Sequence, residues 1–315
     1  SGDEGGGETR VQAWVKGIVR RISKEELKGP LAAWMTRQKE ARTKRVLIIG
    51  DSLVVGIGCE EAPVMPQAIC RHLAQILGVD VAWRALGVNG GDVRTIHRNV
   101  LAAVDDFQRS HIQDGDELLL HGVAAAEPGA PSHQSDSAVL GAILEKSNVD
   151  AVVVLCGLND FKRLWMGRTS SVFRRDLDNF LLELRSKVGE DCLVVLPAIP
   201  FEQTKFPEPL KTFAVMLATL FDEQKRAAAG EVALTHYIPK PALEFWRKAR
   251  GSSGQEEIVA GDGVHPNERG YKAFAEYIAD DMAQVMMLNP AKLAWQRAST
   301  SLASVAEEVH IPEWA

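Results

Sequence analysis

An apolar run that ends in Gly-Asp-Ser is the strongest constraint in this chain. Four aliphatic residues, Val46 to Ile49, are followed directly by Gly50, Asp51 and Ser52. A short apolar run bounded by glycine is typical of a strand that is buried on both faces of a parallel sheet. Such a strand ends at Gly50 and places Ser52 at the carboxyl edge of the sheet, where open α/β sheets bind ligands.

Strand-like and helix-like patterns alternate along most of the remaining sequence. We expect further strands over 79–86, 151–156, 192–198 and 232–237, with a short extra strand over 117–120. We expect helices over 66–77, 95–107, 137–146, 173–188, 210–229 and 270–286. This alternation predicts βαβ units, and therefore an α/β fold whose parallel sheet has helices on both faces.

A serine hydroxyl becomes a nucleophile only when a base removes its proton, and the best base is a histidine held by a carboxylate. Asp262 and His265 lie three residues apart in a glycine-containing loop that precedes the last expected helix. In such a turn the carboxylate can reach Nδ1, which leaves Nε2 free to face a serine. The sequence therefore predicts Ser52, His265 and Asp262 as catalytic residues.

An attacked carbonyl becomes an oxyanion and needs hydrogen-bond donors that are already in position. Three candidate donors fall at expected strand ends: the backbone N–H of Ser52, the backbone N–H of Gly90 and the side-chain amide of Asn159. Gly91 is the alternative to Gly90, because the two glycines are adjacent. Four segments thus each bring one suitable group to the same edge of the sheet.

These segments resemble the conserved blocks of the SGNH hydrolases, also called the GDSL esterase/lipase superfamily. The matching segments are Gly50–Leu53, Gly87–Gly90, Gly157–Asp160 and Asp262–His265, and the resemblance spans residues 45–285. It implies a three-layer α/β/α, flavodoxin-like fold with a central sheet of about five parallel strands. It also implies ester hydrolysis through an acyl-enzyme, without a metal ion or another cofactor.

The ends of the chain add helices to this pattern. We expect a disordered segment and helical arm over 1–44, the hydrolase domain over 45–288 and a helical extension over 289–315. The N-terminal arm fits either a basic amphipathic helix on a membrane or partner, or a helix docked on its own domain. Oligomerisation through the terminal helices stays open, as does the role of the insertion-like stretch at 110–135.

Composition narrows the partners and the compartment. A net charge of -6 argues against nucleic acid as the main partner. No apolar run approaches the roughly 18 residues that a transmembrane helix needs. The four cysteines have no metal-type spacing, and no Asn-x-Ser/Thr site is present, which favours an intracellular location, cytoplasmic or organellar. The chain begins at Ser1, so we expect that its original N-terminus, with any targeting peptide, is missing.

The function hypothesis is a serine esterase that acts on a small-molecule or lipid ester. Phe161, Trp165 and Phe201 follow strand ends and are candidates for the wall of a substrate pocket, although ordinary loop packing explains such aromatics equally well. Two alternatives remain: an acyltransferase that uses the same site, and a non-catalytic subunit that retains the fold for assembly.

Overall fold

The computed structural model describes residues 43–60, 64–105, 117–124, 149–251 and 255–287. Apart from Thr43, these belong to the second of two compact units, Ser1–Thr43 and Lys44–Ala315. The expected N-terminal arm, the helix over 137–146 and the C-terminal helical extension lie outside the described residues. The division at residues 44 and 288 therefore stays a prediction.

The central sheet has five parallel strands in the order β2-β1-β4-β5-β6. Their bounds are β1 Lys44–Gly50, β2 Val81–Val88, β4 Ala151–Leu155, β5 Leu193–Pro197 and β6 Thr235–Ile238. A sixth strand, β3 (Glu117–Ala124), pairs antiparallel with β2 and forms the edge of the sheet. The structure thus confirms the predicted parallel sheet, and the expected short extra strand is longer and antiparallel.

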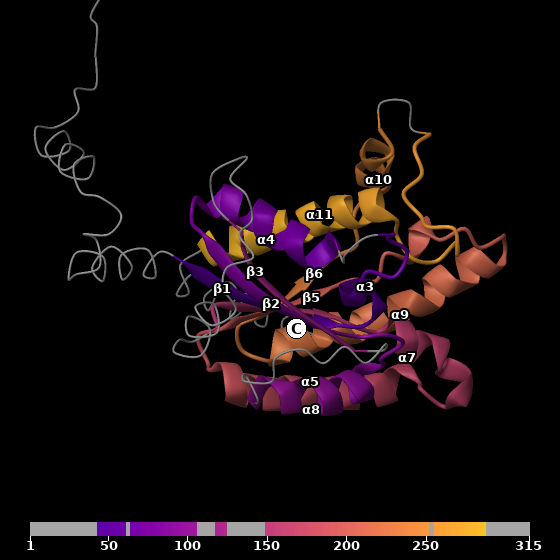
Figure 1. Ribbon diagram of the computed structural model, residues 1–315. Coiled ribbons are helices and arrows are strands. Elements are labelled where there is room, and N and C mark those ends of the chain that lie inside the picture. Colours follow the sequence, from indigo (N-terminus) through magenta and orange to yellow (C-terminus); the bar gives the residue numbers. More distant parts are fainter. Residues whose placement is uncertain (1–42, 61–63, 106–116, 125–148, 252–254, 288–315) are drawn as a thin grey trace, which may run out of the picture. The chain divides into compact units, whose positions relative to one another are not determined.

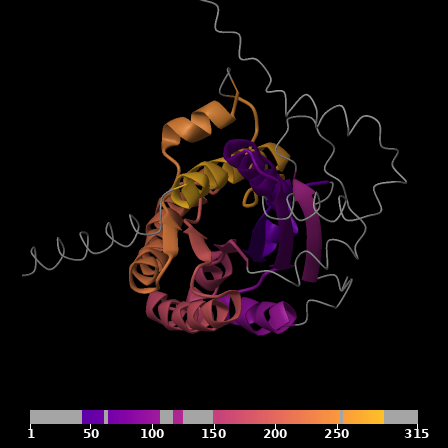
Figure 2. The ribbon, with the colours of Figure 1, turned by 90° about the vertical axis from the view of Figure 1, so that its left-hand side faces the viewer.

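Helices cover both faces of this sheet (Figure 1). On one side lie α4 (Val64–Leu77) and α11 (Glu268–Met287), and the short α10 (Leu243–Ala249) adds Trp246 to the same core. On the other side lie α5 (Val93–Asp105), α8 (Ser170–Val188) and α9 (Leu210–Glu231). Figure 2 shows the same separation from the side, with α11 in yellow opposite α5 and α8. The fold is therefore the expected three-layer, flavodoxin-like α/β/α arrangement.

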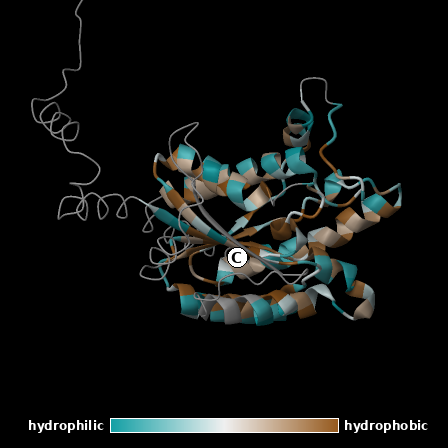
Figure 3. Cartoon of the chain, in the orientation of Figure 1, coloured by the Kyte–Doolittle hydropathy of each residue, from teal (hydrophilic) through white to brown (hydrophobic). Residues whose placement is uncertain are grey.

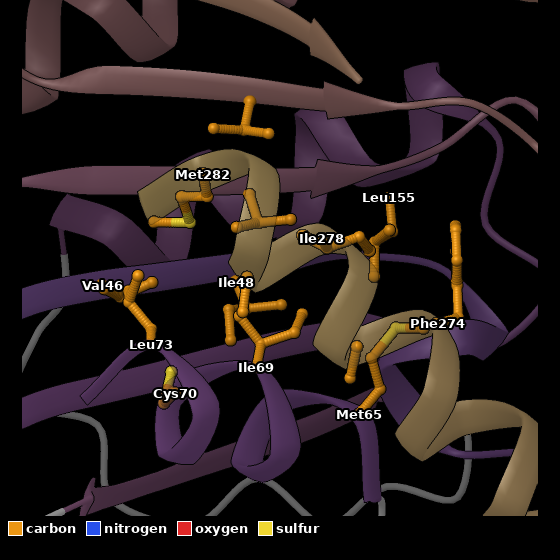
Figure 4. Packing of buried hydrophobic residues seen from close by; sticks show 14 of the residues in the cluster. Val46, Ile48, Met65, Ile69, Cys70, Leu73, Leu155, Phe274, Ile278 and Met282 are labelled. Carbon is orange, nitrogen blue, oxygen red and sulfur yellow. The ribbon is translucent and has the colours of Figure 1, made fainter. Parts of the chain in front are cut away.

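Alternate residues of β1 enter the two separate apolar cores because neighbouring side chains of a strand point to opposite faces. Val46 and Ile48 belong to the core under α4 and α11, whereas Leu47 and Ile49 belong to the core under α5, α8 and α9. Figure 4 shows the first of these cores, with Val46 and Ile48 beside side chains of α4 and α11, among them Ile69, Leu73, Ile278 and Met282. Figure 3 shows the strands as mainly hydrophobic, while hydrophilic residues are spread over the helices.

Within the described ranges, no helix combines the length and the apolar character that a membrane crossing requires.

The strand order reverses between β1 and β4, and ligands of such sheets bind at the carboxyl ends of the strands around this point. The strand ends are level, because Gly50 pairs with Gly87 of β2 and with Leu155 of β4. Ser52 follows β1 and Asn159 follows β4, so the two residues flank the reversal point.

Glycines at these strand ends allow a short helix, α3 (Ser52–Val55), to pack directly against the sheet. A Cβ atom on Gly87 would lie 2.8 Å from Cγ2 of Val55. A Cβ atom on Gly50 would lie 2.5 Å from the carbonyl oxygen of Leu155. Both are closer than side chains tolerate, so the absence of a side chain at each position determines where Ser52 can lie.

Candidate active site

Ser52 is the first residue of α3, and its hydroxyl faces the loop before α11. The distance from Ser52 Oγ to His265 Nε2 is 3.0 Å, a hydrogen bond between residues 213 positions apart. The short helix begins with Asp51 as its cap, whose Oδ1 accepts the Leu53 N–H at 3.0 Å. As the first helical residue, Ser52 has a backbone N–H without a partner inside the helix.

The loop that carries His265 is organised by Asp262. Oδ2 of Asp262 lies 2.5 Å from His265 Nδ1, and Oδ1 accepts the N–H groups of Val264 at 2.9 Å and His265 at 3.0 Å. Burial raises the pKa of Asp262, but these hydrogen bonds outweigh it and hold the pKa below its ordinary value. Asp262 is therefore a carboxylate near neutral pH, and it orients the imidazole ring through Nδ1.

Asn159 joins the ends of β1, β2 and β4. Its Nδ2 donates to the carbonyl oxygen of Gly91 at 3.1 Å and to Oδ2 of Asp51 at 3.3 Å. The preceding turn uses Gly157 at φ +106°, a conformation that residues with a side chain rarely adopt. The amide of Asn159 thus lies beside both glycine-rich and serine-bearing segments.

The two neighbouring glycines after β2 differ in what their N–H groups do. The N–H of Gly91 donates to Val88 O at 3.0 Å and closes a turn. Gly90 lies at the corner of this turn with φ +67°. The Gly91 N–H is therefore occupied within the turn.

Asp51 is fully buried behind Ser52 and contacts the Asn159 amide. Burial raises its pKa from 3.8 to about 6, against the effects of the Leu53 N–H and of the positive charge on Lys225. Lys225 is itself 1% exposed, and its Nζ donates to Pro197 O at 2.8 Å. A buried lysine on α9 therefore contributes to the electrostatic environment of the strand ends.

Arg163 links the segment after β4 to the segment after β2. Its Nη1 lies 2.5 Å from Oδ2 of Asp92, and its Nη2 lies 3.4 Å from the carbonyl oxygen of Gly90. Asp92 in turn accepts the N–H of Thr95 at 2.9 Å, which caps the first turn of α5. Arg163 therefore ties the Gly90 turn to the chain beside Asn159.

A second link runs through Asp160. Its Oδ2 accepts the N–H of Val93 at 3.0 Å, and its Oδ1 accepts a hydrogen bond from Arg168. Arg168 also donates to Asp176 of α8 and is 7% exposed. The sequence did not predict Arg163 or Arg168 as part of the site. Asp92 lies 71 positions from Arg163, and both carboxylate partners of Arg168 lie eight positions away, at a separation that no local pattern marks as a contact.

A comparison of the sequence with protein families finds one match, to the GDSL-like Lipase/Acylhydrolase family over residues 48–273. The chain belongs to this family. The match covers all four segments on which the resemblance rested, and it makes the chain a hydrolase of the esterase type. No protein of curated function matches the chain.

Solved structures that are similar to the chain have low sequence identity. A carbohydrate esterase family 2 enzyme from Corynascus thermopiles is 15% identical, with 78% of this chain and 67% of that chain covered and a TM-score of 0.47. A GDSL-like lipase from Parabacteroides merdae is also 15% identical, covering 77% and 96% of the two chains with a TM-score of 0.47. TesA is 16% identical in sequence, with 75% of this chain and 96% of the TesA chain covered and a TM-score of 0.46.

In this GDSL-like hydrolase, the three aromatic residues proposed for a substrate pocket lie in different surroundings. Phe201 is buried and lines an apolar pocket together with Leu53 and Leu158. Phe161 packs edge-to-face on Phe201, with ring centres 5.0 Å apart, and does not line that pocket. Trp165 is 84% exposed and lies outside it.

In the part of the hydrolase that the structure describes, no group of three or more His, Cys, Asp or Glu side chains could hold a metal ion.

Proposed function

We propose that this chain is a serine esterase that hydrolyses carboxylic esters through an acyl-enzyme on Ser52. The observation that carries the proposal is the continuous hydrogen-bond chain from Ser52 Oγ to His265 Nε2 and from His265 Nδ1 to Asp262 Oδ2, at 3.0 Å and 2.5 Å. A nucleophile that is hydrogen-bonded to a base, which is in turn held by a carboxylate, is the arrangement that acyl transfer to serine requires.

In the first half of the reaction, Ser52 Oγ attacks the ester carbonyl carbon while His265 Nε2 takes the hydroxyl proton. The tetrahedral intermediate collapses, the bond to the alcohol oxygen breaks, and His265 returns the proton to the leaving alcohol. Asp262 keeps the Nδ1 proton in place and stabilises the imidazolium. In the second half, His265 removes a proton from water, and the water oxygen attacks the acyl carbon. The bond from that carbon to Ser52 Oγ then breaks, His265 returns the proton to Oγ, and the acid is released.

The proposed oxyanion donors are the N–H of Ser52, the N–H of Gly90 and the Asn159 amide. The turn hydrogen bond of the Gly91 N–H supports Gly90, since the Gly91 donor is already in use. Both hydrogens of the Asn159 amide have acceptors, Gly91 O and Asp51 Oδ2. The developing oxyanion must therefore compete with one of them, and a negative charge is the stronger acceptor.

The intact hydrogen-bond chain argues against a non-catalytic subunit, because a protein that keeps the fold only for assembly has no need of it. An acyltransferase would use the same first half-reaction with an acceptor alcohol in place of water. Product analysis with and without candidate acceptor alcohols separates the two reactions, since transfer yields a new ester and hydrolysis yields free acid.

The direct test is the hydrolysis of p-nitrophenyl acetate by the wild type and by Ser52→Ala. We expect kcat to fall by roughly 10⁴–10⁶-fold in this variant. Ser186→Ala is the matched control, because the Ser186 hydroxyl contacts only the carbonyl of Glu183 on the same exposed helix face. Wild-type rates in Ser52→Ala would contradict the proposal.

A further inference from the structure

Lys225 is buried behind the proposed esterase site, and the role inferred for it rests on that proposed function. We propose that Lys225 is a positioning residue that holds the Asn159 amide in place for the oxyanion. Its ammonium group does so in two ways, by supplying positive charge behind Asp51 and by supporting the turn at Gly157. Lys225 is 1% exposed, so it acts through these groups and has no contact with the substrate.

The Lys225 ammonium lies at the carboxyl ends of two neighbouring strands, β4 and β5. Its Nζ donates to the carbonyl oxygen of Pro197, the last residue of β5, at 2.8 Å. A Cβ atom on Gly157, two residues after the end of β4, would lie 3.4 Å from Cε and 3.6 Å from Nζ of Lys225. The end of the lysine therefore packs against the turn at Gly157, which leads directly into α7 (Leu158–Lys162) and Asn159.

Packing alone does not explain a lysine at this position. Moving an ammonium group out of water costs free energy, and an apolar side chain of similar length avoids that cost. Asp222, one turn earlier on α9, offsets part of the cost, with Oδ1 3.5 Å from Lys225 Nζ. The same carboxylate also accepts the Ile199 N–H at 3.0 Å and lies 3.6 Å from Nζ of Lys240, which pairs with Glu202 at 3.0 Å. The buried charge of Lys225 therefore calls for a role besides filling space.

Asp51 follows β1, is fully buried, and is subject to charges from α9 and α7. Among these charges Lys225 has the largest effect and Lys162 the next, and both lower the pKa of Asp51, whereas Asp160 raises it. Lys162 is exposed, so water screens its charge, while Lys225 acts from the protein interior. Lys225 is therefore the main positive charge that favours the carboxylate form of Asp51.

The carboxylate form of Asp51 matters because both of its oxygens accept hydrogen bonds. Oδ1 accepts the Leu53 N–H at 3.0 Å, and Oδ2 accepts from the Asn159 amide at 3.3 Å. A protonated carboxyl group carries a hydrogen on one oxygen and is the weaker acceptor. Protonation of Asp51 therefore disturbs either the cap of the helix that carries Ser52 or the orientation of the Asn159 amide.

The expected sign of the pH effect follows from burial. Burial raises the pKa of Asp51 to about 6 even with the Lys225 charge in place. Without that charge, Asp51 holds its proton to a higher pH, and activity is lost at a higher pH on the acid side. Cys156 and Tyr271 also interact with the Asp51 charge, but burial raises the pKa of Cys156 to about 12 and that of Tyr271 above its usual range. Both therefore stay neutral where Asp51 titrates.

The pH dependence of kcat/KM with p-nitrophenyl acetate tests this role in the intact chain. Lys225→Gln removes the charge and retains a side-chain N–H donor. We expect the acid limb to move up by at least about one pH unit, so that kcat/KM falls about 3-fold or more near pH 6.5 and recovers to within about 2-fold of the wild type near pH 9. Arg226→Met is the matched control, because Arg226 is the next residue of α9 and is exposed. Its profile should equal that of the wild type.

Two further measurements distinguish positioning from a loss of folded structure. The fall near pH 6.5 should appear in kcat with little change in KM, because the oxyanion forms only in the transition state. In an Asp51→Asn background, Lys225→Gln should leave the acid limb unchanged, since no carboxyl group remains at residue 51 to titrate. Lys225→Met keeps the test decisive if Lys225→Gln does not fold, because methionine fills the buried space without a polar group.

An unchanged acid limb in a folded neutral variant, or a loss of equal size at every pH, would overturn the inference. Ser52→Ala separates this failure from that of the proposed function. Hydrolysis that depends on Ser52 but has the same pH profile without the Lys225 charge overturns only the role of Lys225. Hydrolysis that does not depend on Ser52 overturns the esterase mechanism itself.

Discussion

Asp51 and Asn159 are hydrogen-bonded to each other across the ends of β1 and β4, with 3.3 Å between Asp51 Oδ2 and Asn159 Nδ2. These two strands flank the point at which the strand order reverses. The residue before the proposed nucleophile thus orients the side chain of a proposed oxyanion donor. The same carboxylate also caps α3, on which Ser52 lies. One buried carboxylate therefore couples the positions of both groups.

Asn159→Ala tests the oxyanion role of the side-chain amide. We expect kcat to fall by roughly 10²–10³-fold with little change in KM, because the donor acts on charge that develops only in the transition state. Steady-state kinetics with p-nitrophenyl acetate measure both parameters. A loss confined to KM would indicate that Asn159 only helps to bind the substrate.

Asp51→Asn tests whether the titration of the buried Asp51 carboxyl group makes the stability of the folded protein depend on pH. The pKa of Asp51 is raised to about 6 in the folded protein, from 3.8, because the side chain is buried. The folded state therefore holds this proton more tightly than the unfolded state, and the contribution of Asp51 to stability falls as the pH rises from about 4 to 6. The difference corresponds to about 3 kcal/mol.

Urea unfolding at pH 4.5 and pH 7 measures this effect. Relative to the wild type, Asp51→Asn should be less destabilised at pH 7 than at pH 4.5, because the variant lacks the titrating group. A stability difference that is the same at both pH values would show that Asp51 does not titrate in this range.

Asp262→Asn tests the orientation of the imidazole. An asparagine can preserve the hydrogen bonds from Val264 and His265 N–H while it favours the wrong tautomer of His265. We expect kcat to fall by about 10⁴-fold, with an unchanged circular dichroism spectrum. An active variant would mean that the 2.5 Å contact between Asp262 and His265 does not serve catalysis.

Arg163→Met tests whether the link to Asp92 and Gly90 O fixes the Gly90 turn. Loss of this link lets the proposed Gly90 donor shift, and a displacement of about 1 Å can cost about 10²-fold in rate. We therefore expect a fall in kcat of roughly 10–100-fold and a smaller change in KM. Arg247→Met is the control, since Arg247 is 74% exposed and pairs only with Glu244 of its own helix. Equal kcat and KM values for both variants would show that Arg163 does not position the Gly90 donor.

The sequence was sufficient to predict where the polar groups of the site gather. Buried parallel strands have continuous apolar runs, such as Ala151–Leu155, whose residues are all buried. Each proposed donor or nucleophile follows such a run by only a few residues. Because the strands end level with one another at Gly50 and Gly87, the positions along the chain were enough to bring the groups together.

Other features depend on contacts that no local pattern reveals. The helices α3 and α7 (Leu158–Lys162) have four and five residues, too few to show a helical period. The pairing of Arg163 with Asp92 joins residues 71 positions apart, and the burial of Lys225 depends on how α9 packs. The exposure of Trp165 likewise depends on tertiary packing, since residue type alone predicts burial for a tryptophan.

The central claim is that Ser52 is a nucleophile activated by His265. Treatment of the folded protein with a fluorophosphonate, followed by mass spectrometry of the peptides, tests it most directly. We predict a single adduct on the peptide that contains Ser52, formed at least about 10³-fold more slowly in His265→Ala. An adduct on another serine, or no adduct on the folded wild-type protein, would contradict the account.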